Sequence, residues 1–260
     1  MIRRLLSPTL LACTVALAGC AASTPTYSSG AGGTTSPSAT GSTPASSPTP
    51  TPSATTEPDC RKLKCIALTY DDGPSTLTPQ LLKAFTDRKA TATLFMLGNA
   101  AETYPETVRK AHQQGFEIAN HTYDHKPISG LSDEKVAWEV AQTNKALARI
   151  TGQTPTLMRP PYAARTSRTD RVVGRNGLAV VVWNNSPEDW VASNQSAEAI
   201  TRLTLQRSSR NSIILMHDIH PWTVEAAPAI IDGLHEQGYT LVTVSQLLGS
   251  TTPGAVHPKA

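Results

Sequence analysis

The chain has 260 residues, of which 39% are hydrophobic and 17% are charged, and its formal net charge is +3 at pH 7. Two of the positive charges, Arg3 and Arg4, lie near the amino terminus, so the chain without residues 1–20 carries a net charge of +1, which is +3 minus 2. A balance this close to neutral excludes the basic surface with which proteins attract nucleic acid. We therefore expect no nucleic-acid partner.

Residues 1–20 have the pattern of an export signal. Arg3 and Arg4 precede an apolar stretch that is too short to span a membrane as a helix. The stretch ends on Leu17-Ala18-Gly19-Cys20, which resembles the bacterial lipobox, and by that resemblance Cys20 is the lipidated first residue of the mature protein. We expect a lipoprotein held at the outer face of the cell membrane by its lipid alone. The alternative is cleavage near Ala22, which would release a secreted protein.

Residues 21–58 form a predicted linker. Every residue from Ala21 to Pro58 except Tyr27 and Glu57 is Ala, Ser, Thr, Pro or Gly. Such a segment has almost nothing apolar to bury, so burial does not offset the entropy lost on ordering. We expect a disordered tether between the anchor and a folded domain.

The remaining cysteines indicate a disulfide. Cys13 lies in the signal and Cys20 is the lipidation candidate, which leaves Cys60 and Cys65 with four residues between them. Outside the cytoplasm such a pair is more typical of a disulfide than of a metal site, because a closed zinc site needs four ligands and the chain has no second cysteine pair. The resulting ring would hold the linker against the start of the domain.

Residues 59–249 have the pattern of one domain, and we expect 250–260 to be a flexible tail. Short apolar runs alternate with helical patterns along the whole domain. Strands are predicted at 65–70, 92–97, 116–120, 156–158, 178–183, 212–217 and 239–244. Helices are predicted at 78–88, with Thr78 as its N-cap, and at 105–114, 132–151, 169–175, 196–209 and 224–237. About seven strands with crossover helices indicate a parallel α/β sheet, either open or closed into a barrel.

Chemically reactive residues follow the predicted strands at their carboxyl ends. They are Asp71 and Asp72, His121 and His125, Arg159, Asp189 and Trp190, and His217 and Asp218. The carboxyl ends of parallel strands meet at one face of an α/β fold, which is where such folds build their sites. Turn formation explains Asp71-Asp72-Gly73-Pro74 taken alone, but it does not explain a reactive set on one side of the sheet.

Two histidines and a carboxylate predict a metal site. His121 and His125 are four positions apart, so both imidazoles can face one point, and Asp72 can supply a third ligand. Three protein ligands with open positions for water are typical of a catalytic metal site rather than a structural one. A solvated pair of loop histidines is the alternative for His121 and His125 alone. We expect a divalent cation, with zinc as the first choice and cobalt, nickel or iron also suited to these ligands.

The residues at the strand ends fall into five segments. They are TYDDGP from Thr69, HTYDH from His121, RPPY from Arg159, the Asp189-Trp190 pair and LMH from Leu215. Their order and approximate spacing resemble the five motifs of the polysaccharide deacetylase family, also called the NodB homology domain. The first two motifs together are highly specific, whereas an Asp-Trp pair or LMH alone means little. The resemblance covers 65–248 and implies a distorted (β/α) barrel with fewer than eight regular strands, a divalent metal and hydrolysis of acetyl groups on sugars.

The resemblance also implies the catalytic roles. Asp72, His121 and His125 would be the metal ligands, Asp71 the general base and His217 the general acid. A metal lowers the pKa of bound water from about 15.7 to about 7, which makes a nucleophile available at neutral pH. Two adjacent carboxylates are then needed, because one binds the ion while the other accepts the proton of the water.

The same resemblance implies supporting roles for the other motif residues. Arg159 would orient Asp71, and Asp189 would orient His217 and raise its pKa. The backbone N–H of Tyr162 would stabilise an oxyanion. Trp190 and Leu215 would wall the acetyl pocket, although plain core packing explains Leu215 equally well.

Several positions stand apart from the motif roles. Tyr70 replaces a Phe common in the first motif, and Ser186 stands where many members of the family carry a further acid, so it receives no role. Asp124 is expected to be a loop residue rather than a ligand. Three residues after the sixth strand could line a substrate groove, namely Asp218, His220 and Trp222.

The expected substrate follows from the expected location. An exported, tethered enzyme meets cell-wall glycan first, so we expect N-deacetylation of peptidoglycan. The alternatives are a chitin-oligosaccharide deacetylase, an acetylxylan esterase, or a wall-binding module that has kept the fold and lost catalysis. The motif residues of the base, the acid and all three ligands are present together, which disfavours the last alternative.

Overall fold

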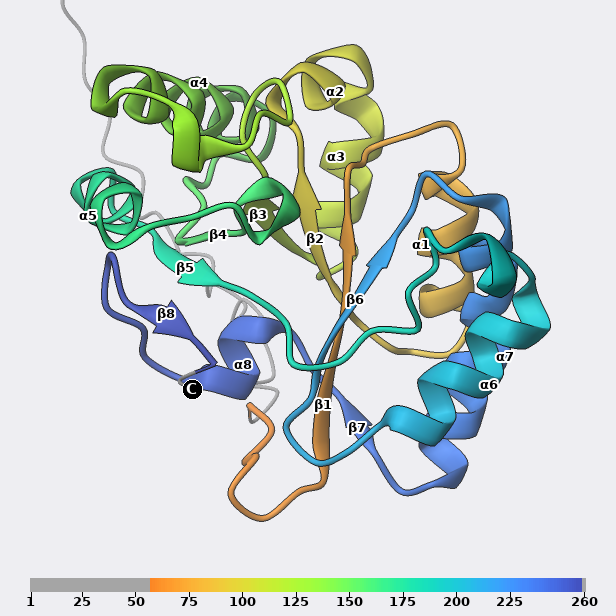
Figure 1. Ribbon diagram of the computed structural model, residues 1–260. Coiled ribbons are helices and arrows are strands. Elements are labelled where there is room, and N and C mark those ends of the chain that lie inside the picture. Colours follow the sequence, from red (N-terminus) through yellow and green to blue (C-terminus); the bar gives the residue numbers. More distant parts are fainter. Residues whose placement is uncertain (1–56, 259–260) are drawn as a thin grey trace, which may run out of the picture. The chain divides into compact units, whose positions relative to one another are not determined.

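The computed structural model describes residues 57–258, in which a curled sheet of short parallel strands is surrounded by helices (Figure 1). The predicted signal peptide and nearly all of the predicted linker lie outside these residues. The strands are β1 (Cys65–Asp71), β2 (Thr93–Met96), β3 (Glu117–Asn120), β4 (Leu157–Met158), β5 (Ala179–Val181), β6 (Ile213–His217), β7 (Thr240–Leu241) and β8 (Val256–His257).

The sheet has the order β6-β1-β2-β3-β4-β5-β8, and β7 pairs with the first residues of β1. Every strand pair in it is parallel. Just after β5, Asn185 forms a parallel bridge with Ile214 of β6, which joins the segment that follows β5 to the other edge of the sheet. The fold is therefore a distorted (β/α) barrel, and the seven predicted strands are confirmed as β1 to β7.

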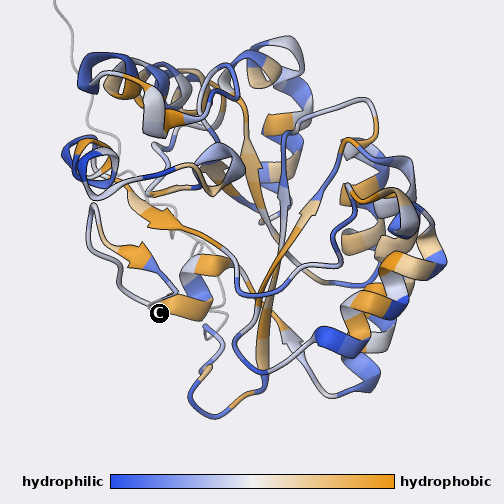
Figure 2. Ribbon diagram, in the orientation of Figure 1, coloured by the Kyte–Doolittle hydropathy of each residue, from blue (hydrophilic) through white to orange (hydrophobic). Residues whose placement is uncertain are grey.

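Eight α-helices of the described chain cover the sheet. They are α1 (Thr78–Thr86), α2 (Gly98–Thr103), α3 (Pro105–Gln113), α4 (Asp133–Thr151), α5 (Ser167–Arg175), α6 (Ala197–Arg207), α7 (Pro221–Glu236) and α8 (Val244–Leu248). Three short 3-10 turns lie between them, at Ile128–Gly130, Pro161–Ala163 and Ala192–Asn194. Apolar residues fill the strands and the helix faces that pack on them, whereas the outer helix faces are largely hydrophilic (Figure 2). No helix in this part of the chain combines the length and apolarity needed to cross a membrane.

Successive side chains along each strand point to opposite faces of the sheet. On β1, Ile66, Leu68 and Tyr70 pack in the cluster beneath the helices, whereas Ala67 packs with Phe95 of β2 in a second cluster. This second cluster fills the barrel interior and takes one or two residues from each contributing strand: Ala67, Phe95, Ala119, Leu157, Ala179, Val181, Ile213 and, from α8, Val244. All of these residues are buried.

Helix ends follow the sequence signals in most places. Ser132 caps α4 by accepting from Lys135 N, and Gly152 ends the helix in the left-handed region at φ 77°. Thr78 is not the N-cap of α1, as the sequence predicts, because Leu77 holds that position. The Thr78 hydroxyl is instead engaged outside the helix, where it accepts from Ser75 N (2.7 Å) and donates to Asp218.

The carboxyl-terminal region differs from its prediction. The last predicted strand is only Thr240–Leu241, because Thr243 caps α8 with a reciprocal capping box and Val244 enters the barrel interior. The sequence predicts a flexible tail at residues 250–260. Val256–His257 instead form β8 on β5, where Val180 N donates to Ala255 O (2.8 Å). The pairing is explained by the edge of β5, whose backbone groups β8 satisfies.

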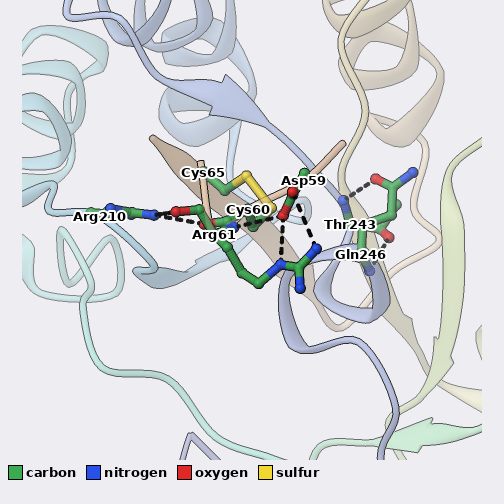
Figure 3. Close-up of a disulfide and its surroundings, with 7 residues drawn as sticks. All are labelled: Asp59, Cys60, Arg61, Cys65, Arg210, Thr243 and Gln246. Carbon is green, nitrogen blue, oxygen red and sulfur yellow. Dashed lines mark hydrogen bonds and ion pairs between the residues drawn. A yellow bond between two sulfur atoms is a disulfide. The ribbon is translucent and has the colours of Figure 1, made fainter. Parts of the chain in front are cut away.

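The predicted disulfide joins Cys60 to Cys65 at the amino end of β1. Figure 3 shows the guanidinium of Arg210 reaching the backbone of this loop, where its Nη2 donates to the carbonyls of Cys60 (2.8 Å) and Arg61 (2.6 Å). Asp59 pairs with Arg61 in the same loop (2.9 Å). Because Cys65 begins β1 and Asp71 ends it, the disulfide and the reactive residues lie at opposite ends of one strand.

Candidate active site

The candidate site lies at the carboxyl ends of the strands, where the inward-facing positions continue the barrel interior. Counting in steps of two from the interior residues leads to Asp71 on β1, His121 after β3, Arg159 after β4 and His217 on β6. Asp71 and His217 are also register partners across β1 and β6. The period of the strands therefore delivers four reactive side chains to one end of the barrel.

Asp72, His121 and His125 form a three-residue cluster. The Oδ1 of Asp72 lies 3.3 Å from His121 Nε2 and 3.0 Å from His125 Nε2. One ligand atom from each residue lies within 4.8 Å of the others. Asp72 Oδ1 is buried and has no hydrogen-bond partner among the described residues, although two imidazole nitrogens face it. A cation shared by the three side chains would satisfy this oxygen, so the residues present fit a divalent metal.

The backbone around the ligands adopts an uncommon conformation. Asp72, Thr122 and His125 have φ angles of 73°, 69° and 58°, in the left-handed region that non-glycine residues seldom occupy. Asn120 supports the histidine loop from the end of β3, because its Oδ1 accepts the N–H of Thr122 (2.8 Å). Such conformations persist only where neighbouring contacts enforce them, and they cluster at functional sites.

His121 is held in the tautomer that a metal ligand requires. Its Nδ1 lies 2.8 Å from the carbonyl oxygen of Arg159, which can only accept, so Nδ1 carries the proton. The lone pair is then on Nε2, the atom that faces Asp72. Histidines that bind metals typically donate their other ring N–H to an acceptor of this kind.

The carboxyl group of Asp72 is held ionised. Burial raises its pKa, but the imidazoles of His121 and His125 that face the carboxylate and the charge of His217 outweigh burial, and the pKa is lowered. An ionised carboxylate is the form that coordinates a cation.

Arg159 is fully buried and binds Asp71. Its Nη1 donates to Asp71 Oδ1 and to Thr69 Oγ1, each at 2.7 Å, and its guanidinium lies 4.0 Å from the centre of the Phe95 ring. Burial lowers the pKa of Arg159 despite the favourable charge of Asp71. The second oxygen of Asp71, Oδ2, lies 3.7 Å from His121 Nε2, so it faces the ligand cluster.

Asp189 holds His217 with both carboxylate oxygens. His217 Nδ1–H donates to Asp189 Oδ1 (2.8 Å), and the backbone N–H of His217 donates to Oδ2 (2.8 Å). Thr223 also donates to Oδ2 (2.8 Å), and the indole N–H of Trp222 donates to the Asp189 carbonyl (2.9 Å). The imidazole is therefore fixed in orientation with its Nε2 free of this network.

The same contacts change the acidity of His217. Burial lowers the pKa of the imidazole, but the hydrogen bond and charge of Asp189, with the charges of Asp71 and Asp72, raise it from 6.5 to about 9. His217 is therefore protonated at neutral pH, as a general acid must be.

The three expected substrate residues have different environments. Tyr162 has a left-handed backbone (φ 58°) and is 68% exposed, and its ring centroid lies 4.7 Å from that of His125. Trp190 is 44% exposed, with its ring perpendicular to that of His217 at 5.5 Å. Leu215 is buried in β6. Tyr162 thus lies next to a metal-ligand candidate, and Trp190 lies next to the candidate acid.

The positions without an assigned role mostly support loops. Ser186 donates to the Leu215 carbonyl (3.0 Å) and accepts the N–H of Glu188 (2.9 Å), so it ties the Asp189 loop to β6. Asp218 is buried, and a Cβ on Gly73 would lie 2.4 Å from both of its carboxylate oxygens. The turn after Asp72 thus packs directly on Asp218 and leaves room only for glycine. The His220 ring stacks on that of Trp222, with the centroids 4.9 Å apart.

Sequence reasoning missed the side chains that hold the site together. Thr69 links Arg159 to β6, because its hydroxyl accepts from Arg159 and donates to the Ile214 carbonyl (2.7 Å). Thr223 donates a hydrogen bond to Asp189 Oδ2. Thr69 lies two positions before Asp71, so strand alternation could have placed it on the inward face. No local pattern marks Thr223, because its partner Asp189 comes from a distant segment, whereas Asn120 accepts from Thr122 N only two positions on, as in a local Asx turn.

Replacing Asp189 with Asn should lower the pKa of His217, because the carboxylate charge that opposes burial is lost. In the wild type the pKa is raised from 6.5 to about 9, so the stabilisation from the protonated pair is fully present below pH 6.5 and lost as pH rises through about 9. That shift corresponds to about 3 kcal/mol. The pKa of His217 is measured by NMR titration, and the free energy of unfolding is measured across the same pH range. The control is Glu188→Gln, which alters an exposed neighbour of Asp189. A variant whose His217 still titrates near 9 would contradict the role given to Asp189.

Replacing Gly73 with Ala should disturb the turn that carries Asp72, because the new methyl group collides with the Asp218 carboxylate. Overpacking of this kind costs about 1–3 kcal/mol. The matched control is Gly130→Ala, since a Cβ there has no atom within 4 Å. In an Asp218→Ser background the penalty should shrink, which a double-mutant cycle of unfolding free energies measures. Penalties that simply add would show that Asp218 is not the colliding group.

Comparison with known proteins agrees with this geometry. Residues 59–181 match the family described as polysaccharide deacetylase. The peptidoglycan-N-acetylmuramic acid deacetylase PdaC of Bacillus subtilis (strain 168) is 37% identical over 185 residues, covering 71% of this chain but only 38% of that protein. A peptidoglycan-N-acetylglucosamine deacetylase of Bacillus cereus is 35% identical over 191 residues, covering 71% of this chain and 88% of that protein.

A solved structure gives the same result for the fold. The T48 deacetylase with substrate superimposes with a TM-score of 0.73 and 38% sequence identity, covering 76% of this chain and 98% of that one. The likeness extends over the barrel and beyond the residues that the family match covers. The chain belongs to the polysaccharide deacetylase family.

Proposed function

We propose that this chain is a metal-dependent deacetylase that removes N-acetyl groups from peptidoglycan. One observation carries the proposal: Asp72, His121 and His125 converge on one point, with Asp71 Oδ2 facing the same point and His217 on the neighbouring strand. Three ligands, a second carboxylate and a protonated imidazole are the groups that hydrolysis of an amide requires.

The ligand set suits zinc, and also cobalt, nickel or iron. A divalent cation held by Asp72, His121 and His125 supplies Lewis acidity, which lowers the pKa of a water molecule and polarises a carbonyl. The protein contributes ligands whose protonation states are already set, through the ionised Asp72 and the His121 tautomer.

Asp71 is the proposed general base. Its Oδ1 accepts a hydrogen bond from Arg159, which restrains the carboxylate with its Oδ2 directed to the ligand cluster. A carboxylate in this position can accept the proton of the attacking water. The adjacent Asp72 cannot do so while it serves as a ligand, so the two carboxylates divide the work.

His217 is the proposed general acid. Its Nδ1–H is held by Asp189, which leaves Nε2–H to protonate the amine that departs from the sugar. The raised pKa keeps this proton in place at neutral pH. The backbone N–H of Tyr162 is the proposed oxyanion donor, and Trp190 with Leu215 would wall the acetyl group.

The choice of peptidoglycan rests on two supports. The relatives compared above are named for deacetylation of N-acetylmuramic acid or N-acetylglucosamine in peptidoglycan. The export signal expected from the sequence and the Cys60–Cys65 disulfide both suit a protein outside the cytoplasm, where wall glycan lies. We therefore propose an exported enzyme anchored by lipid at Cys20, and N-acetyl groups of wall glycan as its target.

Acetate release from purified wall glycan tests the proposal. The wild type should release acetate, chelation should abolish release and zinc should restore it. Asp71→Asn should lower kcat by about 10²–10⁴, because a general base contributes that much. Asp87→Asn is the matched control, since it makes the same chemical change at an exposed position, where the side chain pairs with Lys83 of α1.

The substrate panel should include chitin oligomers and acetylxylan, and preference for either would replace peptidoglycan in the proposal. Acetate release that survives both chelation and Asp71→Asn would contradict the mechanism. Glycan binding without any release would instead identify a wall-binding module.

A further inference from the structure

Glu139 is a fully buried carboxyl group that the proposed reaction does not use. It lies on α4, the longest described helix, which packs against β3 (Figure 1). A buried carboxyl group is costly unless its oxygens receive hydrogen bonds or a charge partner. Its partners therefore indicate what the residue does.

Those partners are backbone groups of the loop between the two histidine ligands. Glu139 Oε2 accepts the N–H of Tyr123 and the N–H of Asp124, each at 3.0 Å. The other oxygen, Oε1, has no hydrogen bond among the described residues, and the Lys126 ammonium lies 3.7 Å from it. The carboxyl group thus grips the segment that joins His121 to His125.

Together, the side chains of Asn120 and Glu139 accept hydrogen bonds from three successive backbone N–H groups. Thr122 N donates to Asn120 Oδ1, and the next two amides donate to Glu139 Oε2. Successive N–H groups that converge on acceptors require backbone angles of alternating hand, as in an anion-binding nest. The left-handed angles at Thr122 and His125 bracket this segment, so the acceptors hold a conformation that the loop would not keep unaided.

The conformation of this loop sets the position of His125. His121 has a separate support, since its Nδ1 binds the Arg159 carbonyl, whereas His125 follows directly after the gripped amides. Its Nε2 then lies 3.0 Å from Asp72 Oδ1, and its side chain is 25% exposed. Releasing the amides would free His125 from Asp72 before it freed His121.

We propose that Glu139 is a positioning residue for the metal site, which sets the affinity for a divalent cation by holding the His121–His125 loop without touching the ion. The inference rests on the proposed function in one respect, that Asp72, His121 and His125 bind a cation. It adds a residue from a helix, outside the strand ends that supply the ligands.

Calorimetric titration of chelator-stripped protein with zinc ion alone tests the inference. Glu139→Met removes both acceptor oxygens and should weaken zinc affinity about 10–100-fold, as loss of a group that orients a ligand does. Glu139→Gln keeps the shape and one acceptor oxygen, so its affinity should lie between those of Glu139→Met and the wild type. Glu134→Gln makes the same chemical change at an exposed position of α4 and should bind zinc as the wild type does.

A second control separates positioning from general destabilisation. Leu147→Ala truncates a buried side chain of α4 in the core beneath the helices, away from the loop. It should lower the thermal midpoint of the apoprotein and leave zinc affinity unchanged. Glu139→Gln, being isosteric, supplies the measurement where Glu139→Met does not fold.

Three outcomes would overturn the inference. Wild-type affinity in both Glu139 variants would show that the loop does not need the carboxyl group. If zinc affinity also falls in Leu147→Ala, in the same proportion to the lost stability as in the Glu139 variants, Glu139 acts only through the stability of the fold. If the wild type binds no zinc, the proposed function itself is contradicted. This outcome differs from the first, in which the wild type and both Glu139 variants bind zinc equally well.

Discussion

The buried ion pair between Arg159 and Asp71 is the interaction on which the site depends. Arg159 is fully buried and Asp71 is 2% exposed, so neither charge is solvated by bulk water. Arg159 follows β4 directly and contacts three further strands. Its side chain donates to Thr69 on β1 and to the Val181 carbonyl on β5. Its backbone N–H donates to the carbonyl of Asn120 at the end of β3. Removing one member of such a pair costs about 3–5 kcal/mol, because the other is left buried and unpaired.

This pair explains why two carboxylates stand side by side at the end of β1. Asp71 lies on the inward face, and Arg159 fixes it there by one oxygen. Asp72 follows in the left-handed conformation, which turns its carboxylate to the histidines instead of continuing the strand. The two neighbouring aspartates therefore have different partners, because the backbone conformation directs Asp71 to Arg159 and Asp72 to the histidines.

Much of this arrangement can be read from the sequence, because strand alternation and parallel pairing are local rules with long-range results. The runs that end at Asp71 and His217 predict both strands, and the shared carboxyl edge predicts that these residues meet.

The residues that support the site could not be predicted in the same way. Thr223 looks like an ordinary polar residue until Asp189, from a distant segment, is brought next to it. The pairing of Val256–His257 with β5 was missed because two residues carry no periodicity, and the open edge that they cover is a property of the assembled sheet.

The account predicts where a metal ion binds, and a crystal structure of the zinc-loaded protein with anomalous scattering measures this directly. The zinc ion should lie about 2.0–2.2 Å from one Asp72 oxygen and from Nε2 of His121 and of His125. Asp71 and His217 should lie beside the ion without either being one of its protein ligands. An ion bound by Asp71 in place of Asp72, or bound without one of the two imidazoles, would contradict the account.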